Sequence, residues 1–205
     1  MAVGKEIKKK IGSVENTQKV TSAMQMVAAS KMRRTQDQMN ESRPYSSRIR
    51  QVIAHLASAN PEYKHVYMGE RDVKRIGYIV VSTDKGQCGG LNANLLRLLV
   101  RKMQAEEGDG VETDLALIGN KAAAFFRSVG GNVVAAINEV GETPKIEDLL
   151  GGVKVMLDAF EQGIIDRLDI ISNTFVNTMT QTPEIKQLLP LDSGEGEDQH
   201  NTWDY

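Results

Sequence analysis

The chain has 205 residues, of which 40% are hydrophobic and 25% charged, and its formal net charge is -2 at pH 7. These values are ordinary for a soluble globular protein, and no run approaches the ~18 consecutive apolar residues of a membrane-spanning helix. The N-terminus lacks the apolar stretch of a secretory signal peptide. A single cysteine, Cys88, excludes an internal disulfide framework, so a reducing compartment is expected.

Charge is distributed unevenly along the chain. Residues 1–50 contain 11 Lys and Arg against 4 Asp and Glu, whereas residues 191–205 contain 5 acidic residues and no basic one. A basic arm on an acidic body suggests that the arm meets an acidic partner surface. A solvated helix face explains the same charge equally well.

The first segment of the chain reads as one long helix. Between Lys5 and Ala59 the only helix breakers are Gly12 and Pro44, and strong helix formers dominate. Some fifty helical residues would span about 75–80 Å, a length typical of a coiled coil or a shaft. Pro44 is expected to kink or interrupt the helix.

A seam of residues spaced by three and four follows this helix, but it is imperfect because only six of its ten positions are apolar. The positions are 7, 11, 14, 18, 21, 25, 28, 32, 35 and 39. Residues 20–30, by contrast, are uncharged, and small or apolar side chains occur on all sides. Met24 and Met26 point about 200° apart, so one partner helix cannot cover both. A helix that is apolar all round must be surrounded.

Two interpretations of residues 20–30 remain open: a helix buried in this chain's own core, and a helix gripped by partner proteins. Charged turns flank the segment at residues 8–10 and 31–34, which favours partners because the helix would leave any core at both ends. Methionine also suits surfaces that must accept changing neighbours.

After residue 75 the pattern changes to alternating strands and helices, which predicts an α/β fold with an open, largely parallel sheet and helices on its faces. The expected strands are 76–83, 114–118, 132–137, 168–179 and a short one at 184–189, and the expected helices are 92–107, 120–128 and 146–160. We therefore assign residues 1–59 to a shaft helix, 60–75 to a polar connector, 76–191 to a Rossmann-like domain and 192–205 to an acidic loop.

A glycine-rich turn follows the first strand and contains Gly86, Cys88, Gly89 and Gly90. Its spacing is not G-x-G-x-x-G, and the chain has no phosphate-binding G-x-x-x-x-G-K-[ST] motif. We interpret the turn as structural, with glycines that permit a tight bend and close backbone packing. A dinucleotide-binding enzyme with a helical oligomerisation arm is the alternative.

Catalysis and metal binding are not indicated elsewhere. Cys88 has no Cys partner, the three histidines lie outside the alternating region, and no Cys, His and Asp cluster has ligand spacing. A basic helix that binds nucleic acid is a third interpretation, but the uncharged residues 20–30 are unsuited to tracking phosphates.

Two long motifs resemble the signatures of one protein family. Residues 17–32 (TQKVTSAMQMVAASKM) are similar to the N-terminal helix signature of the gamma subunit of bacterial F-type ATP synthases, and residues 82–92 (STDKGQCGGLN) resemble that family's second signature. The similarity extends over essentially the whole chain, including residues 128–132 and 187–191.

This resemblance implies a central rotor shaft of the F1 sector, in which rotation driven by proton flow is coupled to ATP synthesis or hydrolysis. The shaft would stand in a ring of alternating alpha and beta subunits, which hold the catalytic sites. Its foot would contact the epsilon subunit and the membrane c-ring at the cytoplasmic face of the bacterial inner membrane, without inserting. The Rossmann-like domain would hold no nucleotide, cofactor or metal.

By the family pattern, the residues expected to face the alpha and beta subunits are Lys19, Val20, Met24, Met26, Val27, Lys31 and Arg33. Those expected at the foot near the c-ring are Ser42, Arg43, Pro44, Tyr45, Asp204 and Tyr205. The family chain continues past the match to residues 203–205 into a returning helix, so the resemblance implies that this sequence is a fragment that lacks the C-terminal helix and cannot form the two-helix shaft alone.

Overall fold

The computed structural model describes residues 2–59, 65–141 and 144–191. The chain divides into two units, residues 1–53 and residues 54–205, which are described here one at a time. Helix α1 (Ala2–Ala59) has 58 residues and accounts for the whole described part of the first unit. The expected long helix is therefore present.

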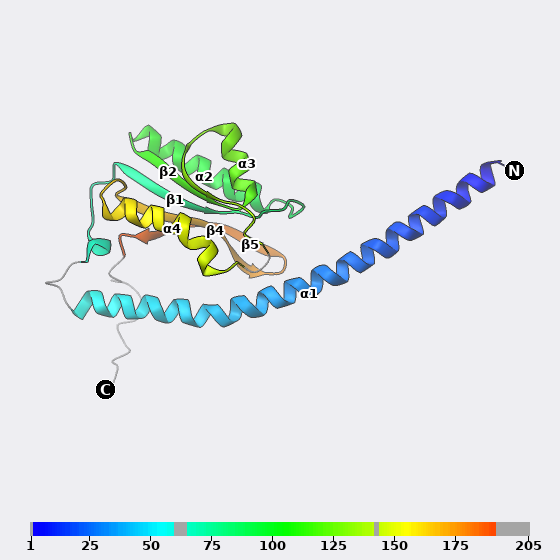
Figure 1. Cartoon of the computed structure of the whole chain (residues 1–205), viewed down its shortest axis with the longest axis horizontal. Coiled ribbons are helices and arrows are strands. Elements are labelled where there is room, and N and C mark those ends of the chain that lie inside the picture. Colours follow the sequence, from blue (N-terminus) through cyan, green and yellow to red (C-terminus); the bar gives the residue numbers. More distant parts are fainter. Residues whose placement is uncertain (1, 60–64, 142–143, 192–205) are drawn as a thin grey trace, which may run out of the picture. The chain divides into compact units, whose positions relative to one another are not determined.

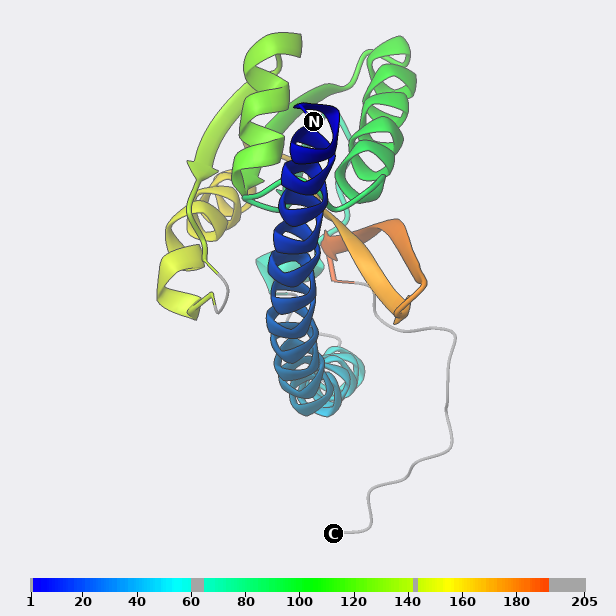
Figure 2. The same ribbon diagram turned by 90° about the vertical axis from the view of Figure 1, so that its right-hand side faces the viewer.

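Helix α1 continues through Pro44 without a break, so the alternative that Pro44 interrupts the helix is wrong. Figures 1 and 2 show α1 as one continuous, curved helix. Proline removes a single backbone donor, and side chains beside it bond within the helix: Ser42 Oγ donates to the Gln38 carbonyl at 2.9 Å, and Ser46 Oγ donates to the Arg43 carbonyl at 2.9 Å.

The second unit contains a five-stranded sheet in the order β3-β2-β1-β4-β5. The strands β1, β2, β3 and β4 run parallel, and β5 pairs antiparallel with β4. This confirms the largely parallel α/β sheet. The bounds are β1 Arg75–Val81, β2 Glu112–Ile118, β3 Asn132–Ile137, β4 Arg167–Asn177 and β5 Thr180–Leu189.

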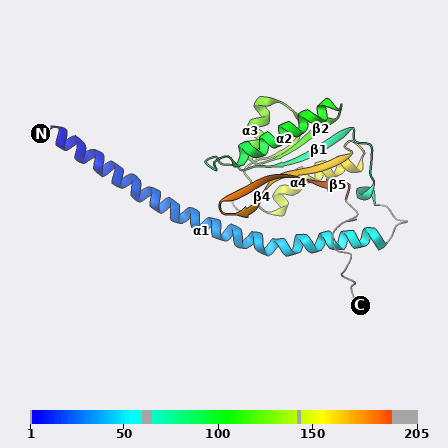
Figure 3. The ribbon, with the colours of Figure 1, turned by 180° about the vertical axis from the view of Figure 1, so that it is seen from behind.

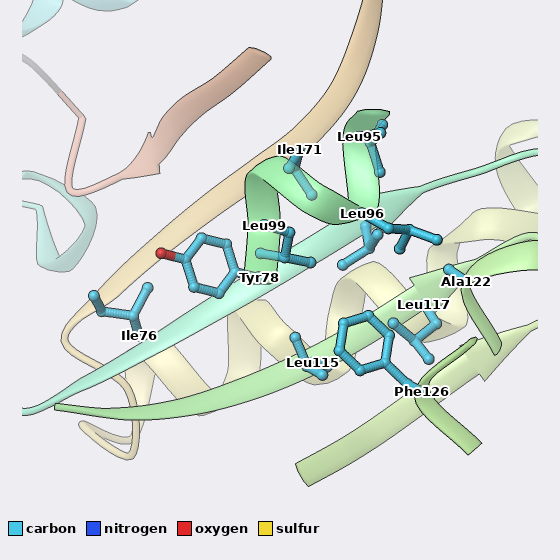
Figure 4. Close-up of a cluster of buried hydrophobic side chains, with 11 residues drawn as sticks. Ile76, Tyr78, Leu95, Leu96, Leu99, Leu115, Leu117, Ala122, Phe126 and Ile171 are labelled. Atoms are coloured by element: carbon cyan, nitrogen blue, oxygen red, sulfur yellow. The ribbon is translucent and has the colours of Figure 1, made fainter. Parts of the chain in front are cut away.

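Helices cover both faces of this sheet, as Figures 1 and 3 show. Helices α2 (Leu91–Gly108) and α3 (Asn120–Val129) pack on one face, and α4 (Ile146–Glu161) packs on the other. The five central residues of β1, Ile76 to Val80, are all buried, as expected of a parallel strand covered on both sides. Figure 4 shows the side chains of the core beneath α2 and α3, where Tyr78 of β1 lies beside Leu99 of α2.

The last two strands differ from the prediction. The expected strand 168–179 ends at Asn177, and the short strand expected at 184–189 begins at Thr180 instead, which makes a hairpin. Pro183 lies within the observed strand, where it pairs with Asn173 of β4. Because β5 lies at the edge of the sheet, it accommodates a proline that a central strand would exclude.

The described part of the expected connector is packed rather than free. It contains the short 3-10 helix η1 (Val66–Met68), and Tyr67 Oη donates to Glu161 Oε1 of α4 at 2.5 Å. The Arg71 guanidinium lies 4.5 Å from the Phe160 ring centre and donates to the Phe160 carbonyl at 2.8 Å. These contacts fix the entry to β1 against the C-terminal end of α4.

Candidate functional site

The central segment of α1 presents apolar side chains in more than one direction. Val20, Met24, Met26 and Val27 are between 55% and 69% exposed. Met24 and Met26 point about 200° apart on the helix, and both are accessible. A helix with accessible apolar groups on several sides buries them only when it is surrounded, which favours the interpretation as a partner-binding segment.

Cationic side chains border this segment. Lys19 precedes it and Lys31 and Arg33 follow it, and all three are exposed. The seven residues expected to contact a ring therefore occupy one continuous stretch of helix, with the apolar members in the middle and the charged members at both ends.

Threonine hydroxyls of α1 bond back to the helix itself. Thr17, Thr21 and Thr35 donate to the carbonyls four residues earlier, at 3.0, 2.8 and 3.0 Å. Thr21 and Thr35 are polar members of the predicted seam. Because their hydroxyls are satisfied internally, their methyl groups remain available for packing, so the seam is less polar than its letters indicate.

The expected foot segment, Ser42 to Tyr45, lies inside α1, where the Tyr45 side chain is 71% exposed. The other two residues assigned to the foot, Asp204 and Tyr205, lie outside the described residues. The assignment of Asp204 and Tyr205 to the foot therefore stays a prediction.

The glycine turn lies between β1 and α2. Gly89 has φ +60°, a left-handed conformation that favours glycine, and Gly90 precedes the first residue of α2. Cys88 is half-buried, and its Sγ accepts a hydrogen bond from Asn92 Nδ2 at 3.2 Å. A Cβ at Gly86 would lie 3.3 Å from Lys121 Nζ. These features fit the expected tight turn.

Sequence reasoning missed the role of Asp84, which stands at the carboxyl end of β1. Its Oδ1 accepts hydrogen bonds from the backbone amides of Asn120, the first residue of α3, and Glu139, at 3.0 and 3.2 Å. Its Oδ2 accepts from the Gly141 amide at 3.2 Å. A carboxylate thus occupies the N-terminus of α3, where a bound phosphate would otherwise be favourable.

Beside Asp84, the backbone segments that directly follow β1 and β2 approach each other closely. Gly119 has φ +94°, and a Cβ there would lie 2.3 Å from the carbonyl oxygen of Ser82. Ser82 Oγ also accepts from the Ala122 amide at 2.9 Å. Asp84 and this contact together give a physical reason why a nucleotide phosphate would be repelled and sterically excluded at this edge.

A buried ionic cluster was also missed. Glu106 of α2 and Asp169 of β4 are 6% and 3% exposed. Arg167 donates to both carboxylates, at 2.8 Å to Glu106 Oε1 and 3.1 Å to Asp169 Oδ2, and Tyr78 Oη donates to Glu106 Oε2 at 2.5 Å. Burial, with Glu106 as hydrogen-bond acceptor, raises the pKa of Tyr78 above its ordinary value. The cluster joins α2 to β1 and β4.

Neither a metal centre nor a membrane span emerges from the described ranges. Within 2–59, 65–141 and 144–191, no three His, Cys, Asp or Glu residues are placed to hold a metal ion. Over the same ranges, none of the helices combines the length and the apolar character needed to cross a bilayer.

Two solved structures contain chains similar to this one, and the first of them supports the fold. A central stalk chain in the Tetrahymena thermophila mitochondrial ATP synthase central stalk/c-ring structure superposes with a TM-score of 0.64 at 21% identity, covering 83% of this chain and 72% of that chain. A chain of the Euglena gracilis mitochondrial ATP synthase (OSCP/F1/c-ring) gives a TM-score of 0.45 at 17% identity, covering 73% of this chain and 54% of that chain.

Comparison with family models identifies the relationship. The model described as ATP synthase matches residues 4–205, which include all but the first two residues of α1, the glycine turn and the whole sheet. This agrees with the resemblance of residues 17–32 and 82–92 to gamma-subunit signatures. The chain therefore belongs to the ATP synthase family, as a central stalk subunit of the F1 gamma type.

Proposed function

We propose that this chain acts as the rotor shaft that couples proton-driven rotation to ATP synthesis or hydrolysis in a ring of alpha and beta subunits. The family match over residues 4–205 supports the role, and so does a 58-residue helix with accessible apolar side chains around its middle. In this proposal the chain itself is non-catalytic and binds no cofactor, and the catalytic groups belong to the ring.

The ring contacts lie on the central segment of α1. The apolar side chains of this segment pack against an apolar inner surface of the ring, namely those of Val20, Met24, Met26 and Val27. Removing their exposed apolar surface from water lowers the free energy of the complex. Lys19, Lys31 and Arg33 meet acidic loops of the beta subunits at the two ends of this apolar segment.

The foot contacts complete the assembly. Ser42, Arg43, Pro44 and Tyr45 of α1, with Asp204 and Tyr205, lie near the membrane c-ring and the epsilon subunit. The chain attaches peripherally at the cytoplasmic face of a bacterial inner membrane, through protein contacts. The exposed Tyr45 side chain is the described residue that best supports a protein contact there.

The main support for the proposal is the exposure of Met24 and Met26 on different sides of α1. The experiment therefore replaces these two methionines and measures binding to the ring. The double variant Met24→Glu, Met26→Glu retains helix propensity, so α1 should remain helical by circular dichroism. Each buried methionine contributes about 1.5–3 kcal/mol, so the affinity for an alpha–beta assembly that lacks its shaft subunit should fall at least about tenfold.

A matched control places the same substitution outside the proposed interface. Met179, in the β4–β5 turn, is 90% exposed, and Met179→Glu should bind the ring as tightly as the wild type. Equal binding by the wild type and the double variant would show that the apolar segment is not the ring contact. Failure of the wild type to bind the ring or alter its ATP hydrolysis would contradict the proposed function.

A further inference from the structure

A pocket of about 700 Å³ opens at the amino-terminal ends of the parallel strands, whereas the glycine turn lies at their carboxyl ends. It lies where β1, β2 and β3 begin, between the C-terminal ends of α2 and α3. This volume falls within the range of small-molecule sites in proteins. It lies entirely within the second unit and has no part in the ring contacts of α1 proposed above.

One wall of the pocket is apolar. It is formed by four side chains of α2 and α3 and by the residue that precedes β2, namely Val100, Met103, Phe126, Val129 and Val111. Phe126 is buried in the core below α3, whereas Val129 is 60% exposed at the rim. This wall would cover the aliphatic stem of a ligand and remove it from water.

The remaining charge in the pocket is predominantly negative. Glu107, Glu112 and Asp114 line it, and the only cationic residue in the lining is Arg75. The C-terminal ends of α2 and α3, represented by Glu107 and Val129, add the negative ends of two helix dipoles. The electrostatic field therefore favours a cation.

Asp114 identifies the atom that a cation would reach. The residue is 4% exposed, and its Oδ1 accepts from Asn132 Nδ2 at 2.8 Å and from Arg75 Nη1 at 3.5 Å. Among the described residues no donor bonds to its Oδ2, although Asp114 lines the pocket. Oδ2 is not fully buried, so it remains accessible to a cationic donor in the pocket, and hydrogen bonds to a charged partner are about twice as strong as neutral ones.

We propose that this pocket binds a guanidinium or primary ammonium group carried on an aliphatic stem. The charged head donates to Asp114 Oδ2 and pairs with Glu107, while the stem packs on Met103 and Phe126. Arg75, whose guanidinium is paired with Glu112 and Asp114, shows that this end of the sheet accommodates such a head group. A free aliphatic amine and the side chain of an arginine or lysine from another protein share this chemistry.

The test uses the full chain labelled with nitrogen-15 and titrated with agmatine, an aliphatic amine that also carries a guanidinium. Backbone amide signals of Gly110, Gly130 and Gly131, which line the pocket, should shift in a saturable manner. 1-Butanol, an uncharged probe of similar stem length, should leave them in place. A second titration uses N-acetyl-arginine-methylamide: tighter binding than agmatine points to a protein side chain, and weaker binding points to a free amine.

Variants distinguish the pocket from general attraction to acidic surfaces. Asp114→Asn keeps an acceptor for Asn132 and Arg75 but removes the charge, and it should weaken agmatine binding about tenfold or more. Glu107→Gln, at an exposed position, should weaken it about threefold. Glu147→Gln, an exposed acid in the first turn of α4, should leave the affinity unchanged.

Two results would overturn the proposal. One is the absence of saturable shifts at Gly110, Gly130 and Gly131 up to millimolar agmatine. The other is binding that Glu107→Gln and Glu147→Gln weaken equally, because that outcome reflects surface charge alone. Glu107→Gln remains decisive if Asp114→Asn loses its folded spectrum. Neither result bears on the shaft function, which is measured through ring binding.

Discussion

The carboxylate of Asp84, at the end of β1, accepts a hydrogen bond from the backbone amide of Asn120, the first residue of α3, at 3.0 Å. The same side chain also accepts from the amides of Glu139 and Gly141. One residue therefore ties together three loops that follow three different strands.

Replacing Asp84 with alanine should lower the free energy of unfolding by about 1–3 kcal/mol, because three backbone donors lose a charged acceptor. Urea unfolding should show a lower midpoint with an unchanged slope. Asp72→Ala, at an exposed position that precedes β1, is the matched control and should change the midpoint little. An equal midpoint for both variants would mean that the Asp84 contacts contribute nothing to stability.

Much of the fold could be predicted because the signal is local. The continuous apolar residues 76–81 indicate a buried strand, and the expected β3 and the N-terminal limits of α3 and α4 coincide with those observed. The Asp84 contacts could not be predicted, since Glu139 lies 55 residues away and a carboxylate after a strand has many possible partners. The only available signal was an acidic residue inside a turn that resembles a phosphate-binding turn.

The same limit explains the cluster around Glu106. In the sequence, a single acidic residue on a helix indicates only a solvated charge. Arg167 of β4 comes near α2 because the strand register places Tyr78 opposite Asp169. In α1 the opposite holds: the different directions of Met24 and Met26 were predicted from spacing alone, because a helix determines the direction of its side chains without any tertiary contact.

Gly119 and Gly130 form a matched pair for testing the close strand contact. Both have nearly the same φ, +94° and +93°, but a Cβ would meet the Ser82 carbonyl at 2.3 Å only at Gly119, and nothing within 4 Å at Gly130. Gly130→Ala should cost about 1–3 kcal/mol through backbone strain alone. Gly119→Ala should cost at least about 2 kcal/mol more, because backbone must also move. Equal losses in chemical denaturation would contradict the steric argument.

Asp169 should give the protein a pH-dependent stability with a defined sign. Burial raises the pKa of this carboxyl above its ordinary value of 3.8, although Arg167 acts in the opposite direction. The folded state then binds the proton at a higher pH than the unfolded state does. The contribution of Asp169 to stability therefore rises as the pH falls through the raised pKa, and the gain is complete below the ordinary one.

The measurement compares the wild type with Asp169→Asn by urea unfolding at a series of pH values from 7 to 4. The variant lacks the ion pair with Arg167 at every pH, and its asparagine has no carboxyl group that could bind a proton as the pH falls. The difference in unfolding free energy should therefore shift in favour of the wild type as the pH falls. A difference that stays constant, or that shifts the other way, would show that burial does not control this carboxyl.

The cationic border of the central α1 segment should control the salt dependence of ring binding. Changing Lys19, Lys31 and Arg33 to glutamine should weaken binding at low salt by about tenfold and flatten its dependence on ionic strength. Removing three exposed cations from the second unit, Arg97, Arg127 and Lys154, changes the net charge by the same amount. If this control variant loses as much affinity and salt dependence, net charge rather than position is responsible.

The threonines of α1 have a mechanical consequence for a shaft. The hydroxyls of Thr17, Thr21 and Thr35 donate to carbonyls of the same helix, so these hydroxyl protons are not available to a surrounding surface. Contacts through methyl groups change by small increments as two surfaces slide, whereas hydrogen bonds favour fixed angles. At these positions the helix can therefore rotate without favouring one angle. Preferred rotational angles would come from the lysines and arginines at either end of its uncharged middle.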